Sequence, residues 1–206
     1  MRLTAWREWV GSSTPWERVV FWALDLETTG LDPTRDHIIS AGMVPVRGGT
    51  IRIGERWHTH VCAPEGARSS LDALRVHHIM PRESAGAPSL GDVVRGVDRR
   101  LREGVLLVHF ATLDVAFLRE ACRRIGQRWP RPRVVDTAAL AWRLHQRATW
   151  PREPAAEPGL GLADVRAAMG LPPHQAHDAL ADAVATAELF LVLRSRLDLR
   201  SLRQLV

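Results

Sequence analysis

Asp25 and Glu27 are the first residues of the chain whose types and spacing could do chemistry. They follow the apolar run Val19–Leu24, whose short length and β-branched and aromatic residues are typical of a strand buried on both faces. Side chains two apart in a strand share a face, so both carboxylates should point the same way. Two like charges repel each other unless a cation lies between them, and carboxylate oxygens favour a hard divalent ion such as Mg²⁺ or Mn²⁺. The alternative is a strand end whose acids simply face water.

Two further aspartates, Asp114 and Asp136, each stand between an apolar strand and a helix. An aspartate at such a place is often the N-cap of the helix. We keep the N-cap interpretation for Asp136, whereas for Asp114 both a cap and a functional role stay open.

His177 and Asp182 carry a modest signal near the last strongly predicted helix. His177 precedes this helix, and Asp182 lies about 200° around it from Leu180. The pattern predicts that Asp182 faces away from the buried stripe, which we assign to Leu180, Val184, Ala187 and Leu191.

The elements that must position these residues form two halves. The first half predicts an antiparallel meander: the strand that carries the two acids, a strand over 38–46, a hairpin turn over 47–50 and a strand over 51–61. The second half alternates strands with helices, which is typical of parallel pairing with helical cover. Its predicted strands are 105–110 and 133–135, and the predicted helices of the chain are 71–79, 89–102, 114–125, 137–144, 162–169 and 179–193.

Composition limits the class of protein. With 206 residues, 46% hydrophobic and 25% charged, the chain has the profile of one globular domain with a proper core. No apolar run approaches the roughly 20 residues that cross a bilayer, and the N-terminus lacks the apolar core of a signal peptide, so we expect a cytoplasmic protein. The net charge of +5, carried entirely by arginine, favours a polyanionic partner such as nucleic acid.

The domain organisation is predicted to be simple. Residues 1–17, with Trp6, Trp9 and Trp16, form an extension packed on the domain; residues 18–193 form the domain; and residues 194–206 form a short tail with one more short helix. Proline and glycine mark 147–161 as a surface loop within the domain.

Three motifs then occur in one order: Asp25-x-Glu27-Thr28-Thr29-Gly30-Leu31-Asp32-Pro33, His109-x-Ala111-x-x-Asp114 and His177-x-Ala179-x-x-Asp182-Ala183-x-x-Thr186. Over residues 17–193 the chain thereby resembles the DEDDh family of 3′–5′ exonucleases, which includes the epsilon proofreading subunit of bacterial DNA polymerase III. Three linked motifs are far more specific than any one of them.

This resemblance implies an α/β fold of the ribonuclease H-like type, with a five-stranded mixed sheet flanked by helices. It implies two Mg²⁺ or Mn²⁺ ions held by Asp25, Glu27, Asp114 and Asp182, with His177 as the general base. Thr28, Thr29 and Leu31 would line the site of the 3′-terminal nucleotide.

The chain departs from the family pattern at Phe110, where members commonly have asparagine. Phe110 replaces a polar group near the site, so substrate positioning should differ. His77-His78 stands where the family often has Val-His-Gly, and we interpret one of the two as structural or close to the substrate.

The first hypothesis is therefore a metal-dependent 3′–5′ exonuclease that releases nucleoside monophosphates from single-stranded DNA or RNA. The alternatives are a catalytically weak nucleic-acid-binding or polymerase-adaptor module on the same fold, and an enzyme of the ribonuclease T type that trims RNA 3′ ends. The presence of all four acids and the histidine favours the enzyme. We expect any proofreading role to require a DNA polymerase in trans.

Overall fold

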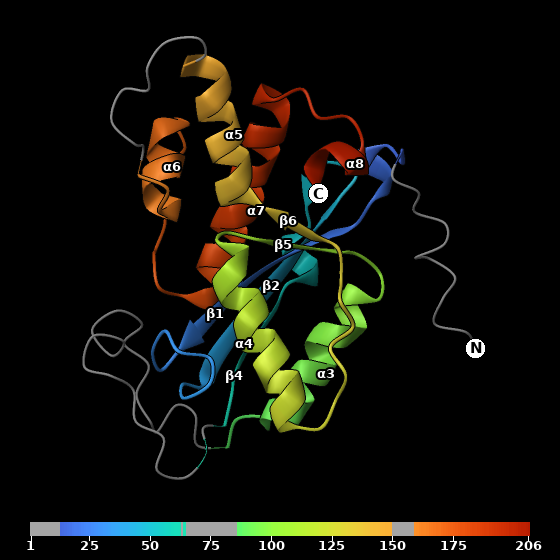
Figure 1. Cartoon of the computed structure of the whole chain (residues 1–206), viewed down its shortest axis with the longest axis vertical. Coiled ribbons are helices and arrows are strands. Elements are labelled where there is room, and N and C mark those ends of the chain that lie inside the picture. The colour runs from blue at the N-terminus through green and yellow to red at the C-terminus, as the bar shows by residue number, and fades with distance from the viewer. Residues whose placement is uncertain (1–12, 63, 65–85, 150–158) are drawn as a thin grey trace.

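The computed structural model describes residues 13–62, 64, 86–149 and 159–206 (Figure 1). Several sequence predictions lie outside these residues: the helix over 71–79, His77-His78, Trp6, Trp9 and most of the loop over 147–161.

One mixed sheet forms the centre of the fold. Its strand order is β3-β2-β1-β5-β6, and β4 also pairs with β2. The strands β1 and β2 are antiparallel, whereas β5 is parallel to β1 and β6 is parallel to β5, so the predicted meander followed by parallel strands is confirmed. The strands are β1 (Phe21–Thr28), β2 (Ile38–Arg47), β3 (Thr50–Ile51), β4 (Trp57–His60), β5 (Val105–Val108) and β6 (Val134–Asp136).

The predicted single strand over 51–61 is wrong, because a 3-10 turn, η2 (Ile53–Glu55), divides it into β3 and β4. Pro45 on β2 supplies the physical reason. Its carbonyl accepts a hydrogen bond from the Arg52 amide at 2.9 Å, on the edge that faces β3 and β4. Proline has no N–H to donate on that same edge, so the ladder cannot run on without a break.

Helices cover both faces of the sheet, with α3 and α4 on one and α5, α6 and α7 on the other (Figure 1). The helices are α3 (Leu90–Leu101), α4 (Ala111–Arg124), α5 (Thr137–Thr149), α6 (Leu162–Ala168), α7 (Ala179–Arg196) and α8 (Leu202–Leu205). The last of them confirms the short helix predicted in the tail. In the described part of the chain, none of the helices is long and apolar enough to cross a bilayer.

Alternation along β1 divides the core into two clusters. Phe21 and Ala23 pack with α7, whereas Trp22 and Leu24 pack with α3 and α4. Both faces of β1 are therefore buried, as the apolar run predicted. Burying one side chain of the size of Phe21 or Leu24 contributes about 1.5–3 kcal/mol to the free energy of folding, relative to leaving it exposed.

The first and last described segments of the chain pack into the core cluster on the α7 side of the sheet. Trp16 in the turn η1 (Trp16–Arg18) is buried, and its ring packs against that of Phe190 at 6.2 Å between centroids. Leu202 of α8 is fully buried, and Pro15 bridges to Ser201. The segments before β1 and after α7 thus pack together.

The buried stripe of α7 differs from the predicted one. Leu180, Val184 and Leu191 are only half-buried, and the fully buried positions include Ala183, Ala187, Leu189, Phe190 and Leu193. The helix lies so close to the sheet that Ala183 and Ala187 fill the contact, while Leu180, Val184 and Leu191 lie at its margins. The prediction that Asp182 faces away from the core is therefore wrong, since Asp182 is buried on the sheet side.

Candidate metal-binding active site

Three carboxylates meet where β1 passes under the first turn of α7. Asp25 and Glu27 share one face of β1, because they continue the alternation of Phe21 and Ala23 on the α7 side. Asp182 comes down from α7. One oxygen from each of the three carboxylates lies within 4.8 Å of the other two. Side chains far apart in the sequence are thus brought within the reach of a single ion.

Gly42 allows α7 to come this close. It pairs with Asp25 in the neighbouring strand and faces the start of α7. A Cβ atom at this position would overlap the backbone carbonyl of Ala179, the first residue of the helix. A larger residue would push the first turn of α7, and Asp182 with it, away from the strand.

Burial and mutual repulsion raise the pKa values of the carboxylates in the cluster. Burial, and next the charges of Asp114, Asp182 and Glu27, raise the pKa of Asp25 well above its ordinary value. Burial, followed by the charge of Asp182, raises the pKa of Glu27 to about 7. Such a set of repelling oxygen ligands fits a hard divalent cation, which would remove the repulsion that raises these pKa values.

Asp114 lies beside this trio, as the fourth residue of α4. It is buried, and burial, followed by the charge of Asp136, raises its pKa well above the ordinary range. Because the N-cap of α4 is Phe110, the alternative that Asp114 caps this helix is wrong.

Asp136 confirms its predicted capping role and extends it. Its carboxylate accepts a hydrogen bond from the amide of Ala138 in the first turn of α5, at 2.9 Å. It also accepts from the amides of Phe110 and Ala111 at the start of α4, at 3.1 and 3.0 Å. A single acid therefore caps two helices and fixes the helix that carries Asp114.

Both oxygens of Asp182 are held by the turn that precedes α7. The amide of His177 donates to Oδ2 at 2.8 Å, and Nε2 of His174 lies 2.7 Å from Oδ1. The side chain of His177 is exposed, and its backbone has a left-handed φ of 66°. The predicted histidine, His177, thus contacts Asp182 through its backbone amide, whereas His174 contacts the same carboxylate through its ring.

The buried Arg166 of α6 connects this turn to α7. Its guanidinium donates to the carbonyls of Pro172 and Ala185 at 3.0 and 2.8 Å and pairs with Glu188 at 2.8 Å. The turn that carries both histidines is therefore tied to α6 and to the middle of α7.

The loop after β1 holds the predicted substrate-binding residues. The hydroxyl of Thr28 donates to the carbonyl of Gly30 at 2.7 Å, and the hydroxyl of Thr29 donates to Asp36 at 3.2 Å. Leu31 at the tip is 79% exposed. The threonines therefore shape the loop, while Leu31 projects from it.

His109 and Phe110 follow β5 at the same edge of the sheet. Nε2 of His109 lies 2.7 Å from the carbonyl of Leu160, which can only accept, so this nitrogen carries the proton. Nδ1 lies 2.8 Å from the hydroxyl of Thr137. Phe110 is exposed, and its backbone is left-handed with φ 64°.

Sequence reasoning missed several residues of the site. His174 has a spacing of three to His177, a weak signal that only the tertiary turn makes meaningful. His58 and His60 of β4 lie in register with Gly42 and Ser40 and hence on the same face of the sheet as the acids. The loose alternation of β4 was visible in the sequence, but its register against β2 was not.

The fold and this cluster define a class of protein: a ribonuclease H-like mixed sheet with carboxylates from β1, α4 and α7 gathered beside its central strand. Comparison with known proteins identifies the family within this class. A family model described as Exonuclease (RNase_T) matches residues 22–190. The chain therefore belongs to this exonuclease family, and the resemblance to DEDDh-type 3′–5′ exonucleases is confirmed.

Individual relatives agree with this assignment. The chain is 33% identical to a DNA polymerase III subunit epsilon-like protein of Rhodobacter capsulatus, over 93% of this chain and 26% of that one. It is 33% identical to DNA polymerase III subunit epsilon of Treponema pallidum, over 84% and 76%, and 28% identical to ribonuclease T of Haemophilus ducreyi, over 84% and 84%.

Solved structures support the fold. Escherichia coli exonuclease I in complex with a dT13 oligonucleotide superposes with a TM-score of 0.75 at 18% identity, over 87% of this chain and 42% of that one. The chain thus spans less than half of that nuclease and about a quarter of the Rhodobacter protein.

Proposed function

We propose that the protein is a metal-dependent exonuclease that removes nucleotides from the 3′ end of single-stranded DNA or RNA in the cytoplasm. The observation that carries the proposal is the convergence of Asp25, Glu27 and Asp182 within 4.8 Å, with raised pKa values for the first two. A binding module without catalysis would have no need to hold buried carboxylates against their repulsion.

The donor set fits divalent metal ions, and we assign Mg²⁺ or Mn²⁺, as two ions, to Asp25, Glu27, Asp182 and Asp114. When bound, such ions would supply Lewis-acid stabilisation of phosphodiester oxygens and would lower the pKa of a bound water. The protein contributes the rigidity. The sheet holds β1, and Asp136 holds the first residues of α4. The turn before α7 holds both oxygens of Asp182.

We assign His177 as the general base that takes a proton from the attacking water. Its amide is bonded to Asp182 and its side chain is exposed, and both support this role; histidine is also the side chain most often used as a general base. His174 is assigned to orienting Asp182, because its ring is within hydrogen-bonding distance of that carboxylate. The two roles separate in kinetics. His177→Gln should lower kcat at any metal concentration, whereas His174→Gln should be rescued, at least in part, by excess Mn²⁺.

The loop after β1 and the first turn of α4 would receive the terminal nucleotide. We assign Thr28, Thr29 and Leu31 to this site and Phe110 to its border. Escherichia coli exonuclease I, which shares the fold, has been solved in a complex with single-stranded DNA, and this supports a single strand as substrate. The ribonuclease T relative, matched over most of its length, favours RNA trimming as the second candidate activity.

The test is cleavage of matched 5′-labelled single-stranded DNA and RNA oligonucleotides with Mg²⁺, with Mn²⁺ and with EDTA. We expect a ladder that shortens from the 3′ end, requires metal and disappears in Asp25→Asn and Asp182→Asn. Asp92→Asn, an exposed acid on α3, is the matched control and should cleave as the wild type does. Binding without cleavage under both metals would favour the adaptor alternative, and a purified DNA polymerase added in trans would then test for a proofreading partner.

A further inference from the structure

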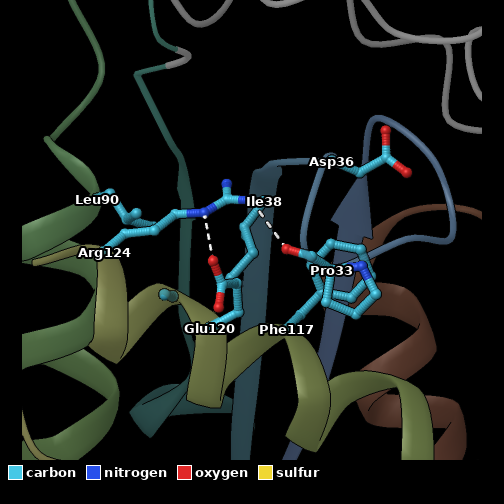
Figure 2. A pocket seen from close by; sticks show the side chains of 8 residues that line it. Pro33, Asp36, Ile38, Leu90, Phe117, Glu120 and Arg124 are labelled. Atoms are coloured by element: carbon cyan, nitrogen blue, oxygen red, sulfur yellow. Dashed lines mark hydrogen bonds and ion pairs between the residues drawn. The ribbon is translucent and has the colours of Figure 1, made fainter.

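Arg124, the last residue of α4, reaches across to the loop that follows β1 (Figure 2). Its Nη2 donates to the carbonyls of Pro33 and Thr34 at 2.8 and 3.1 Å. Its Nη1 lies 2.7 Å from Nδ1 of His37, and its Nε donates to Glu120 at 3.1 Å. The side chain is 21% exposed. One guanidinium therefore joins α4 to Pro33, Thr34 and His37, in a loop about 90 residues earlier in the chain.

The loop is otherwise closed by its own contacts. The Thr29 amide donates to the His37 carbonyl at 2.9 Å, and the His37 amide donates to the Thr29 hydroxyl at 3.0 Å. Asp36 accepts from the Asp32 amide at 2.8 Å, and a Cβ atom on Gly30 would overlap this carboxylate. The loop is thus a compact unit, and its position relative to α4 depends on contacts from outside.

Arginine is suited to this task in a way that lysine is not. Guanidinium offers five N–H donors in a planar fork and no acceptor, so it can serve two carbonyls and an imidazole nitrogen together. Since Arg124 can only donate, Nδ1 of His37 must accept, and the ring is neutral. Burial and the nearby Arg124 charge lower the pKa of His37, opposed by Asp36, which agrees with a neutral ring.

Arg124 lies far from the acids. Asp114 is ten residues earlier on the same helix, which corresponds to about 15 Å along its axis. Pro33 and Ile38 line the small hollow under Arg124 together with Phe117 of α4, so the loop is packed on the helix as well as bonded to it (Figure 2).

We propose that Arg124 is a positioning residue, which fixes the loop over 29–37 on α4 and so sets the binding site of the terminal nucleotide. The inference rests on the proposed function, because it assigns that loop to the substrate. Arg124 acts on substrate affinity through the loop and leaves the chemical step at the acids unchanged.

The test compares Arg124→Ala and Arg124→Lys with Arg123→Ala. Arg123 is the matched control, because it forms a bidentate pair with the same Glu120, at 2.6 and 2.7 Å, and is 73% exposed. We expect Arg124→Ala to raise KM and the inhibition constant of the product mononucleotide about tenfold, with kcat within about twofold, since several hydrogen bonds that position the loop are lost. Arg124→Lys should lie between, and Arg123→Ala should match the wild type.

Hydrogen exchange provides a readout that does not depend on cleavage. The amides of Thr29, Asp36 and His37 are bonded within the loop, and these bonds should open more often once the loop is no longer held on α4. The three amides should therefore exchange faster in Arg124→Ala but not in Arg123→Ala. Unchanged exchange with unchanged KM would overturn the inference, as would a fall in kcat at constant KM. A wild type that cleaves nothing would overturn the proposed function instead, and the exchange measurement would still decide whether Arg124 holds the loop.

Discussion

Asp114 and Asp136 occupy similar places in the sequence, each between an apolar strand and a helix, yet their surroundings are opposite. Asp136 accepts hydrogen bonds from three backbone N–H groups, at the N-termini of α4 and α5. Asp114 is buried next to other acids, and its pKa is raised. The comparison teaches that what surrounds a carboxylate, rather than its place between a strand and a helix, separates a structural acid from a candidate ligand.

The largest expected effect follows from removing the charge of Asp114. Asp114→Asn keeps the shape of the side chain, so the fold should remain, while kcat should fall on the order of 10³-fold. The metal-free variant should melt no lower than the wild type, because the substitution removes a buried charge with a raised pKa. Single-turnover cleavage and thermal melting measure both results. Near-normal cleavage would show that Asp114 is not a ligand.

The matching change at Asp136 should have the opposite profile. Asp136→Ala removes the caps of two helices, so the loss of stability should be about 1–4 kcal/mol, twice the 0.5–2 kcal/mol of a single cap. The cleavage rate, measured well below the melting temperature, should fall by about tenfold or less, because α4 keeps Asp114 but positions it less firmly. Urea unfolding and initial rates test this together. A stable but inactive Asp136→Ala would assign Asp136 to the ligand set and reverse the comparison.

Part of the contrast between Asp114 and Asp136 could be predicted from the sequence, because the motif resemblance singled out Asp114 and the position of Asp136 before a helix indicated a cap. The groups that surround each carboxylate could not be predicted. Apolar runs were enough to predict β1, β2, β5, β6 and the parallel half of the sheet, because strands depend on local periodicity. The ligand roles of the four acids come instead from the resemblance of three motifs to a family, and they stay a prediction. The double cap of Asp136, the contact between His174 and Asp182 and the bonds of Arg124 to the loop depend on turns and helix packing, which periodicity does not report. The buried side of Asp182 was missed because large residues were assumed to mark the core face, whereas α7 uses alanines there.

A third prediction extends the contrast to metal and pH. Burial and acidic neighbours raise the pKa of Glu27 from 4.5 to about 7, so over this range the folded protein binds a proton that the unfolded chain does not. The stability of the metal-free protein should therefore fall as pH rises through this window. Stabilisation by Mg²⁺ or Mn²⁺ should grow over the same window, since metal and protons compete for the carboxylates.

Thermal melting at about pH 5 and about pH 8, with and without metal, tests this balance. At the higher pH, an ion at 100 times its Kd should add about 2.7 kcal/mol, and at the lower pH clearly less. Asp114→Asn should lose part of this gain, whereas Asp136→Ala should keep it despite its lower stability. Equal stabilisation at both pH values would argue that the ion binds elsewhere.

The smallest effect concerns Phe110, whose amide is one of those that Asp136 accepts. A left-handed φ of 64° is unfavourable for a bulky residue, while asparagine and glycine adopt it readily. Phe110→Asn should therefore stabilise the protein by about 0.5–1 kcal/mol in urea unfolding. Phe110→Ala is the control, because it removes the ring but keeps the backbone cost and should gain nothing. If both variants are destabilised, the ring contact with His109, at 4.9 Å between centroids, outweighs the backbone cost, and the capping network of Asp136 includes a packed aromatic pair.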